Sequence, residues 1–249
     1  MKAFVFAAGL GTRLKPYTDT MPKALVPYAG RPMLWHLVRK LKAAGVDELV
    51  INVHHFAGQI VGYVHQENDF GMKVSISDAT DALLDTGGGL LHARPFLEGD
   101  CRLSAGEPFL AHNVDILSNL DINAFVQSGV QGIAKLLVSD RESSRKLLFD
   151  NDMRLVGWKN LSSGQTKGHP EKASCEFAFA GVHLISPSIY GAFDAMKDEG
   201  FTGKFSIVDF YLAACDRFPV SGYLQDGLEV LDLGKPEALE AAARTAALQ

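Results

Sequence analysis

Short apolar runs alternate with amphipathic stretches through the first half of the chain. The run over residues 2–7 is typical of a strand that is buried on both faces, as strands of parallel sheets are. Residues 31–44 repeat apolar side chains at helical spacing and end at Gly45, a natural helix stop. Further strands are predicted at 48–53, 72–77 and 109–112, and further helices at 56–66 and 87–93.

This alternation of strand and helix predicts an α/β fold built on a doubly wound, mostly parallel sheet. In such sheets, ligands bind beyond the carboxyl ends of the strands. The loop that starts at Gly9, the loop at Asp85 and the side chain of Asp115 all follow predicted strand ends. We therefore expect all three to face one cleft.

The second half of the chain is less regular. Alternating apolar positions over residues 145–158 predict a hairpin that turns at 150–152. Residues 161–172 are polar, contain glycines and a proline, and are predicted to form a mobile loop. Further strands are predicted at 132–138, 177–185 and 229–233, with helices at 207–217 and from Pro236 onwards.

Composition and charge narrow the classes of function. The 249 residues are 47% hydrophobic and 21% charged, which suits one large folded domain with a sizeable core. The net charge of −5 argues against broad nucleic-acid binding, which needs a basic face. The 3 cysteines lie far apart without zinc-site spacing, which predicts free thiols in a reducing compartment. No apolar run approaches the length of a membrane span, so we expect a cytoplasmic protein without nucleic-acid or membrane partners.

The first predicted strand runs into a glycine-rich turn, Gly-Leu-Gly-Thr-Arg, at residues 9–13. Such a turn presents bare backbone N–H groups, which bind anions. Arg13 adds a planar fork suited to phosphate oxygens, and Lys23 adds a mobile point charge. The turn matches neither the Walker pattern nor GxGxxG, since position 14 is Leu. Alone it could be a tight strand-to-helix connection, but with Arg13 and Lys23 it predicts a polyphosphate site.

A second glycine cluster, Leu-Asp-Thr-Gly-Gly-Gly, occupies residues 84–89. Three consecutive glycines allow a backbone to approach a flat ligand closely. The alternative is a flexible turn before a helix that Asp85 or Thr86 caps. Because a cap does not require a third glycine, we expect a loop that contacts the base or the sugar of a ligand.

Two aspartates, Asp115 and Asp232, each follow an apolar strand. One carboxylate in such a position is often only a cap or turn residue. If the two converge on a triphosphate site, they suit Mg²⁺, which prefers a few carboxylates together with substrate phosphates and water. The adjacent His54 and His55 point to opposite faces of a strand, so we do not expect them to share an ion.

Together these motifs resemble the sugar-1-phosphate nucleotidyltransferases, and the resemblance covers nearly the whole chain. The family pattern Ala-Ala-Gly-x-Gly-Thr-Arg matches residues 7–13, and Pro-Lys-x-Leu matches residues 22–25. Within the family, the chain is most similar to the short single-domain members. The resemblance is weakest over residues 141–172. It continues at 30–34, 43–46, 52–55, 84–89 and 232–236.

The resemblance implies one nucleotidyltransferase domain over residues 1–249, with a nucleotide-binding part at 1–120 and a smaller mixed sugar-binding part at 121–249. It implies transfer of a nucleotidyl group, expected to be UMP from UTP, to a sugar 1-phosphate such as N-acetylmuramate 1-phosphate. The nucleoside triphosphate and the sugar 1-phosphate would be the binding partners. The products would be pyrophosphate and a nucleotide sugar of the kind used in cell-wall synthesis.

The resemblance also implies roles by position. Arg13 and Lys23 would be the catalytic residues on the phosphates. Asp115 and Asp232 would hold Mg²⁺, and the segment 177–183 would line the sugar side. The contacts to the nucleotide would come from Ala8, Gly9, Gly11, Thr12 and Gly88.

Two positions depart from the family pattern. Relatives usually carry Gly directly before the first metal aspartate, where this chain has Val114, whose branched side chain disfavours positive φ. Relatives often carry an aromatic residue two positions before the second aspartate, where this chain has Val230.

Other interpretations stay open. One is a guanylyl- or cytidylyltransferase acting on a heptose or hexose 1-phosphate or on phosphocholine. Another is a non-catalytic nucleotide-sugar sensor, to which the departure at Val114 gives some support. A Rossmann dehydrogenase is disfavoured by the broken GxGxxG.

Overall fold

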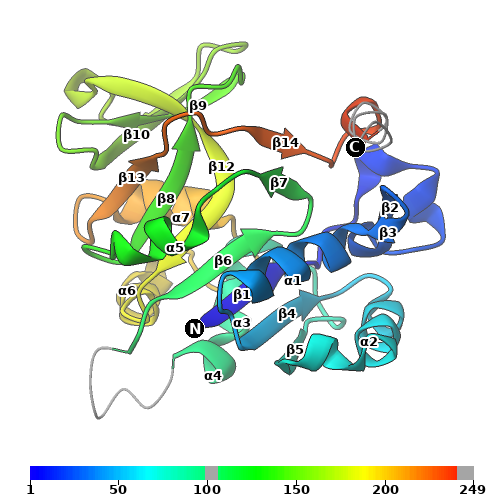
Figure 1. Ribbon diagram of the computed structural model, residues 1–249. Helices are drawn as coiled ribbons and strands as arrows, with labels where there is room; N and C mark the ends of the chain where they lie inside the picture. Colours follow the sequence, from blue (N-terminus) through cyan, green and yellow to red (C-terminus); the bar gives the residue numbers. More distant parts are fainter. Residues whose placement is uncertain (99–105, 240–249) are drawn as a thin grey trace.

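The computed structural model describes residues 1–98 and 106–239. Their largest feature is a 10-stranded mixed sheet. Its strands are β1 (Lys2–Phe6), β4 (Glu48–Val53), β5 (Lys73–Asp78), β6 (Phe109–Asn113), β8 (Ala134–Ser139), β9 (Arg145–Phe149), β10 (Leu155–Asn160), β11 (Thr166–Gly168), β12 (Cys175–Ile185) and β13 (Val220–Leu224). The strand order is β11-β10-β9-β12-β6-β1-β4-β5, with β8 paired to β12 and β13 paired to β8. Figure 1 shows β9 and β10 at the top of the view and β4 and β5 at the bottom.

Helices cover both faces of this sheet, which confirms the predicted α/β class. The helices are α1 (Met33–Ala43), α2 (Ala57–Gln66), α3 (Asp85–His92), α4 (Arg94–Leu97), α5 (Ile122–Gln127), α6 (Ile189–Met196) and α7 (Ile207–Ala214). Side chains alternate along β1, so Ala3 and Val5 pack with α1, α2 and α5. Phe4 and Phe6 pack with α3, α4, α6 and α7 on the opposite face. No helix in the described residues is long and apolar enough to span a membrane.

The first strands are parallel, as predicted: β1 pairs with β4 and β6, and β4 pairs with β5. The rest of the sheet is mixed, because β12 runs antiparallel to β6, β8 and β9. The register of β12 against β8 shifts between Phe179 and His183, where Gly181 has a φ of +72°. This irregularity lets the first part of β12 pair with β9 and its last part with β6.

The predicted hairpin is present as β9 and β10. However, residues 161–172 are not simply a loop, because they contain β11, which pairs with β10. Lys167 lies opposite Trp158 in this pairing, and its Nζ lies 5.5 Å from the centre of the Trp158 ring. All three residues of β11 are exposed, so the strand has no apolar alternation by which a sequence pattern could reveal it.

Other predicted elements agree in type and differ at their ends. The helix predicted over 31–44 begins only at Met33, because Arg31–Pro32 form the short strand β3, paired with β2 (Pro27–Tyr28). The helix predicted over 207–217 ends at Ala214. The helix predicted from Pro236 starts at that residue, and its continuation lies outside the described residues.

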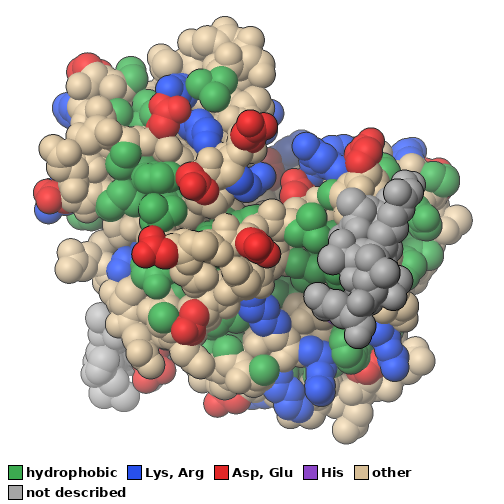
Figure 2. Space-filling model, turned by 45° about the horizontal axis from the view of Figure 1, so that its top comes forward, with side chains coloured by type: hydrophobic (Ala, Val, Ile, Leu, Met, Phe, Trp, Pro, Cys, Tyr) green, Lys and Arg blue, Asp and Glu red, His purple; other side chains and the backbone are tan. Residues whose placement is uncertain are grey.

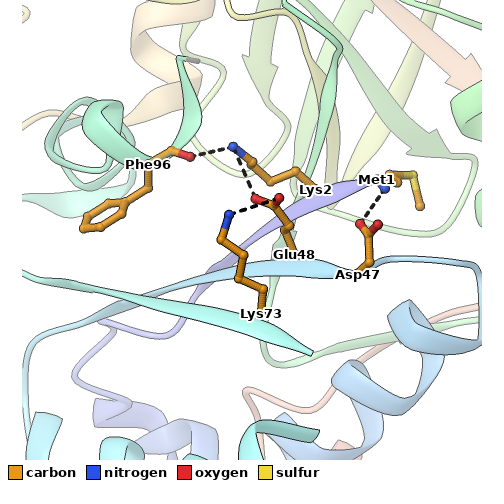
Figure 3. Close-up of polar contacts among 6 residues, drawn as sticks. All are labelled: Met1, Lys2, Asp47, Glu48, Lys73 and Phe96. Atoms are coloured by element: carbon orange, nitrogen blue, oxygen red, sulfur yellow. Dashed lines mark hydrogen bonds and ion pairs between the residues drawn. The ribbon is translucent and has the colours of Figure 1, made fainter. Parts of the chain in front are cut away.

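The amino ends of the parallel strands carry charges that pair with one another (Figure 3). Lys2, Glu48 and Lys73 are aligned on three neighbouring strands. A carboxylate oxygen of Glu48 lies 3.2 Å from Lys73 Nζ, and the other lies 3.7 Å from Lys2 Nζ. The terminal ammonium of Met1 lies 2.6 Å from Asp47 Oδ1. These charges tie strand starts together, and ligand binding is expected at the opposite edge.

Candidate active site

The glycine-rich turn follows the carboxyl end of β1. Gly11 has a φ of +63°, and a Cβ at this position would lie 2.7 Å from Thr18 Cγ2, so glycine is required there. The hydroxyl of Thr18 donates a hydrogen bond of 2.9 Å to the Gly11 carbonyl. The short 3₁₀ helix η1 (Thr12–Leu14) begins after this turn, with Leu14 buried and Arg13 exposed. The burial of Leu14 therefore anchors this segment, and Arg13 stays exposed for contact with a ligand.

Lys23 lies in a second 3₁₀ helix, η3 (Lys23–Leu25), and forms an ion pair with Asp115. Both side chains are largely buried, with 15% of Lys23 and 9% of Asp115 exposed. Val114, which precedes Asp115, is buried in the core and has no positive φ. Its N–H donates to the Phe6 carbonyl at 3.3 Å, which continues the pairing of β6 with β1. The departure from glycine is therefore accommodated without strain at this turn.

A separate two-stranded ladder positions the second aspartate. Strands β7 (Ile116–Ser118) and β14 (Val230–Asp232) pair antiparallel, with Asp232 opposite Ile116. The N–H of Leu233 donates to the Asp115 carbonyl at 2.8 Å. This ladder makes Asp115 and Asp232 neighbours although they lie far apart in the sequence.

Gly234 lies where the charged groups meet. A Cβ on Gly234 would lie 2.6 Å from Asp115 Oδ2, and 2.8 Å from both Arg13 Nη2 and Asp232 Oδ1. The N–H of Gly234 donates to Asp232 Oδ1 at 2.9 Å, and Arg13 Nη1 lies 3.9 Å from Asp232 Oδ2. The structure thus brings together Arg13, Asp115 and Asp232, with Lys23 held through Asp115.

Two cavities adjoin this cluster. The first, of about 410 Å³, is lined by the turn after β1, by Lys23 and by residues from the ends of β4 and β5. The second, of about 920 Å³, lies between β9, β10, β11 and α7. Arg13 lines both, and Asp232 lines the second. Figure 2 shows basic and acidic side chains side by side at the notch between the upper and right-hand parts of the face that it draws. The predicted nucleotide-binding residues that line the first cavity are Ala8, Gly9, Gly11 and Thr12.

Gly88 has a different environment from the one expected. The lining of the first cavity includes Asp85 and Thr86, whereas Gly88 is buried, and a Cβ on it would overlap the Gly203 carbonyl oxygen. The chain before α7 packs directly on α3, and this close approach explains Gly87 and Gly88, whereas a Cβ on Gly89 would lie 2.9 Å from Asn52 Oδ1. The same packing brings Lys204 to the first cavity. Nothing in the local sequence indicates that role, because it depends on contact between two distant segments.

The two adjacent histidines follow β4, which ends at Val53, and they have different surroundings. His54 lines the first cavity, and its Nδ1 lies 2.7 Å from the Ala79 carbonyl oxygen. His55 is exposed.

Comparisons with known proteins assign the chain to a family. A model of the nucleotidyl transferase family matches residues 2–139. The N-acetylmuramate α-1-phosphate uridylyltransferase of Caulobacter vibrioides is 32% identical over 257 aligned positions, which cover 98% of this chain and 96% of that one. The chain belongs to the nucleotidyl transferase family. It is therefore a transferase that acts on nucleotides and sugar phosphates, as the motifs predicted.

Other members are similar over part of the chain or in fold. The enzyme of the same name from Neisseria meningitidis serogroup B is 40% identical over 129 residues, which cover 51% of this chain and 52% of that relative. The structure of HddC from Yersinia pseudotuberculosis with GMP-PN matches with a TM-score of 0.72 at 22% identity, covering 98% of each chain. At that identity the match shows the fold of this nucleotidyl transferase.

The carboxylates of this nucleotidyl transferase fit a metal that also takes ligands from its substrates. Within residues 1–98 and 106–239, no three His, Cys, Asp or Glu side chains form a group that could hold a metal alone. The carboxylate oxygens of Asp115 and Asp232 both lie close to the position that a Cβ on Gly234 would occupy, where they could serve as ligands. Two carboxylates completed by phosphate and water oxygens are a donor set that Mg²⁺ accepts.

Two histidines are buried in the sheet of this nucleotidyl transferase, His112 on β6 and His183 on β12. Burial lowers the pKa of His112 to about 4 and that of His183 to about 3. His183 Nδ1 lies 3.0 Å from the hydroxyl of Tyr211, which is also fully buried. Both imidazoles are therefore neutral at pH 7 and belong to the core.

Proposed function

We propose that this nucleotidyl transferase transfers UMP from UTP to N-acetylmuramate 1-phosphate, giving UDP-N-acetylmuramate and pyrophosphate. The observation that carries the proposal is the convergence of Arg13, Asp115 and Asp232 on Gly234, beside two cavities. The names of the relatives from Caulobacter vibrioides and Neisseria meningitidis support this choice of base and sugar.

The nucleotide is assigned to the first cavity and the sugar phosphate to the second. The backbone around Gly9 and Gly11 offers N–H groups to the phosphates, beside the cations of Arg13 and Lys23. Gly88 shapes the wall behind this cavity by admitting the Gly203 carbonyl. In the second cavity, Trp158 and several hydroxyl and amide side chains suit a sugar ring and its hydroxyls.

The reaction is the attack of a phosphate oxygen of the sugar 1-phosphate on the α-phosphorus of UTP. The new P–O bond forms as the bond to the leaving pyrophosphate breaks. The second pKa of a phosphate monoester is about 6, so at neutral pH the nucleophile is already ionised and requires no general base. The main obstacle is repulsion between two polyanions, which the cations of Arg13 and Lys23 offset.

Asp115 and Asp232 would hold Mg²⁺, which supplies positive charge to the phosphates and to the leaving pyrophosphate. In the structure, Lys23 is paired with Asp115, and Arg13 lies beside Asp232. When substrates bind, Lys23 and Arg13 exchange these carboxylates for phosphate oxygens. The site thus keeps its cations in position and neutralised until the substrates arrive.

An exchange assay tests the proposal. Purified protein is incubated with Mg²⁺, labelled pyrophosphate, each nucleoside triphosphate in turn and a panel of nucleotide sugars and sugar 1-phosphates. We expect label to enter UTP in the presence of UDP-N-acetylmuramate, and UDP-N-acetylmuramate to form in the forward direction. Exchange into GTP or CTP would select the alternative transferases, and the absence of any exchange would support the non-catalytic sensor.

A further inference from the structure

The second cavity holds an unusual balance of charge for an acidic protein. Five basic and three acidic side chains line it, whereas the whole chain has a net charge of −5. Two of the basic groups are already matched, because Arg13 lies beside Asp232 and Lys167 Nζ lies 2.6 Å from Asp209 Oδ1. The three other basic side chains form no ion pair within the described residues. They are Arg141, Arg145 and Lys235.

Of these three cations, Arg141 is the one held in place. Its Nη2 donates to the Phe179 carbonyl at 3.0 Å, and its own carbonyl accepts from Lys146 Nζ at 2.8 Å. Its Nε is buried and has no acceptor among the described residues. By contrast, Arg145 and Lys235 are exposed and lack such anchors. A guanidinium has five N–H donors in a rigid fork, so Arg141 keeps most of its donor capacity for a planar anion.

The reacting phosphate of the acceptor cannot be the partner of every cation in this cavity. That phosphate must approach the α-phosphorus beside Arg13 and Asp232, where the two cavities meet. Arg141 follows β8 and is bonded to β12, in the part of the cavity built by the second half of the sheet. Arg141 is half-buried and has a carbonyl but no anionic partner within the described residues, which is unfavourable for a cation, so its position indicates a second anionic group on the acceptor.

We infer that the acceptor is a sugar 1-phosphate that also bears a carboxylate, and that Arg141 binds this carboxylate and so selects the acceptor. The inference rests on the proposed function and deepens it. A carboxylate matches the planar fork of Arg141 by two parallel hydrogen bonds. N-acetylmuramate 1-phosphate has such a group in its lactyl ether, and N-acetylglucosamine 1-phosphate is the same sugar phosphate without it.

These two acceptors form a matched pair for the test. We expect the wild-type enzyme to favour N-acetylmuramate 1-phosphate by at least about tenfold in kcat/KM, the lower range for one hydrogen bond to a charged group. Arg141→Gln should lower kcat/KM for this acceptor by about 10- to 100-fold, mainly through KM. The same variant should change kcat/KM for N-acetylglucosamine 1-phosphate less than about threefold. Arg141→Lys, which keeps the charge without the fork, should be intermediate.

Arg154→Gln is the control, because Arg154 is an exposed arginine directly before β10 and is not in the cavity lining. It should leave both acceptors unchanged. Equal losses on the two acceptors in Arg141→Gln, or a wild-type enzyme that uses only acceptors without a carboxylate, would overturn the inference and leave uridylyl transfer intact. Absence of transfer to every acceptor would overturn the proposed function as well.

Discussion

The two edges of the parallel strands both carry ion pairs, but the pairs differ in origin and in burial. At the amino edge, Lys2, Glu48 and Lys73 stand in register on adjacent strands, and Glu48 and Lys73 are 39% and 70% exposed. At the carboxyl edge, Lys23 comes from η3 and Asp115 from the turn after β6, and they are 15% and 9% exposed. Water screens the first set, whereas the second interacts strongly with whatever shares its cavity.

This difference indicates what each edge does. Exposed pairs contribute little to stability and are easily replaced, so the amino edge only joins strand starts. The carboxyl edge gathers two cations and two carboxylates around Gly234, beside two cavities. Without a ligand, the cations and carboxylates neutralise one another, which offsets the cost of burying them. With a ligand bound, the same charges are available to its phosphates. Removing a charge should therefore affect catalysis at one edge and almost nothing at the other.

Removal of divalent metal should have the largest effect. Chelation with EDTA is expected to abolish formation of the nucleotide sugar, because Asp115 and Asp232 would then repel the phosphates. Addition of excess Mg²⁺ should restore the activity, measured as pyrophosphate release. Full activity in metal-free buffer would remove both aspartates from the proposed mechanism.

Asp115→Asn should come next, with kcat lowered by about 10³-fold, the scale seen when an electrostatic catalytic group is removed. The measurement is the rate of pyrophosphate release at saturating UTP and Mg²⁺, with the Tm checked to confirm folding. Asp47→Asn is the matched control at the amino edge, where Asp47 pairs with the terminal ammonium. Equal rates of pyrophosphate release in the two variants would contradict the assignment of catalysis to the carboxyl edge alone.

Lys23→Ala and Arg13→Ala should each lower kcat by about 10²-fold while the fold persists. Lys23→Ala also leaves Asp115 buried without its partner, so its Tm should fall more than that of Arg13→Ala, whose side chain is more exposed. Steady-state kinetics and thermal unfolding of both variants test this order. Near-normal turnover in both would contradict the triphosphate assignment.

Acid should destabilise the folded protein through two histidines, His112 and His183, which are buried in the sheet between the two edges. His112 and His183 have lowered pKa values when folded, about 4 and about 3, so the unfolded chain binds more protons as the pH falls below about 6.5. The stability that the neutral histidines provide is thus present above pH 6.5 and is lost on acidification. Each should account for about 2 kcal/mol between pH 7 and pH 5.

Urea unfolding of wild type and His183→Gln at pH 7 and pH 5 measures this loss. The variant should lose less stability on acidification than wild type. His169→Gln is the control, because His169 is only partly buried and lies beside Asp216 near the surface. An unchanged pH dependence in His183→Gln would show that His183 is not the group responsible.

Glu48→Gln should have the smallest effect. It removes two exposed ion pairs, at 3.2 Å to Lys73 and 3.7 Å to Lys2, and should lower the free energy of unfolding by less than about 1 kcal/mol. Turnover should be unchanged. A loss of activity comparable to that of Asp115→Asn would mean that the two edges are coupled through the strands.

Local patterns identified the elements that bury one face against the core. The strand at residues 2–7, the helix up to Gly45 and the hairpin after Arg145 were predicted because burial imposes a period of two or of 3.6 on their side chains. Elements with weak periodicity were missed or misassigned. The exposed strand β11 was predicted as a loop, and β13 was not predicted.

Glycine clusters illustrate the same limit in the candidate site. Gly11 could be assigned to the turn, because the constraint is its own φ and its near neighbours Thr18 and Lys23. The packing around Gly88 could not be predicted, because its constraint is the carbonyl of Gly203, a residue far along the chain. The approach of Lys204 to the first cavity depends on that same contact.

The sequence by itself determined the chemical groups of this nucleotidyl transferase: the anion-binding turn with Arg13, the cation Lys23 and two aspartates at strand ends. Only the tertiary structure decided that these groups meet. The β7–β14 ladder sets Asp232 beside Asp115, and Gly234 leaves the space in which they face Arg13. The physical reason is that periodicity and turn chemistry report each residue's immediate surroundings, whereas convergence depends on pairing between distant segments, which leaves no local pattern.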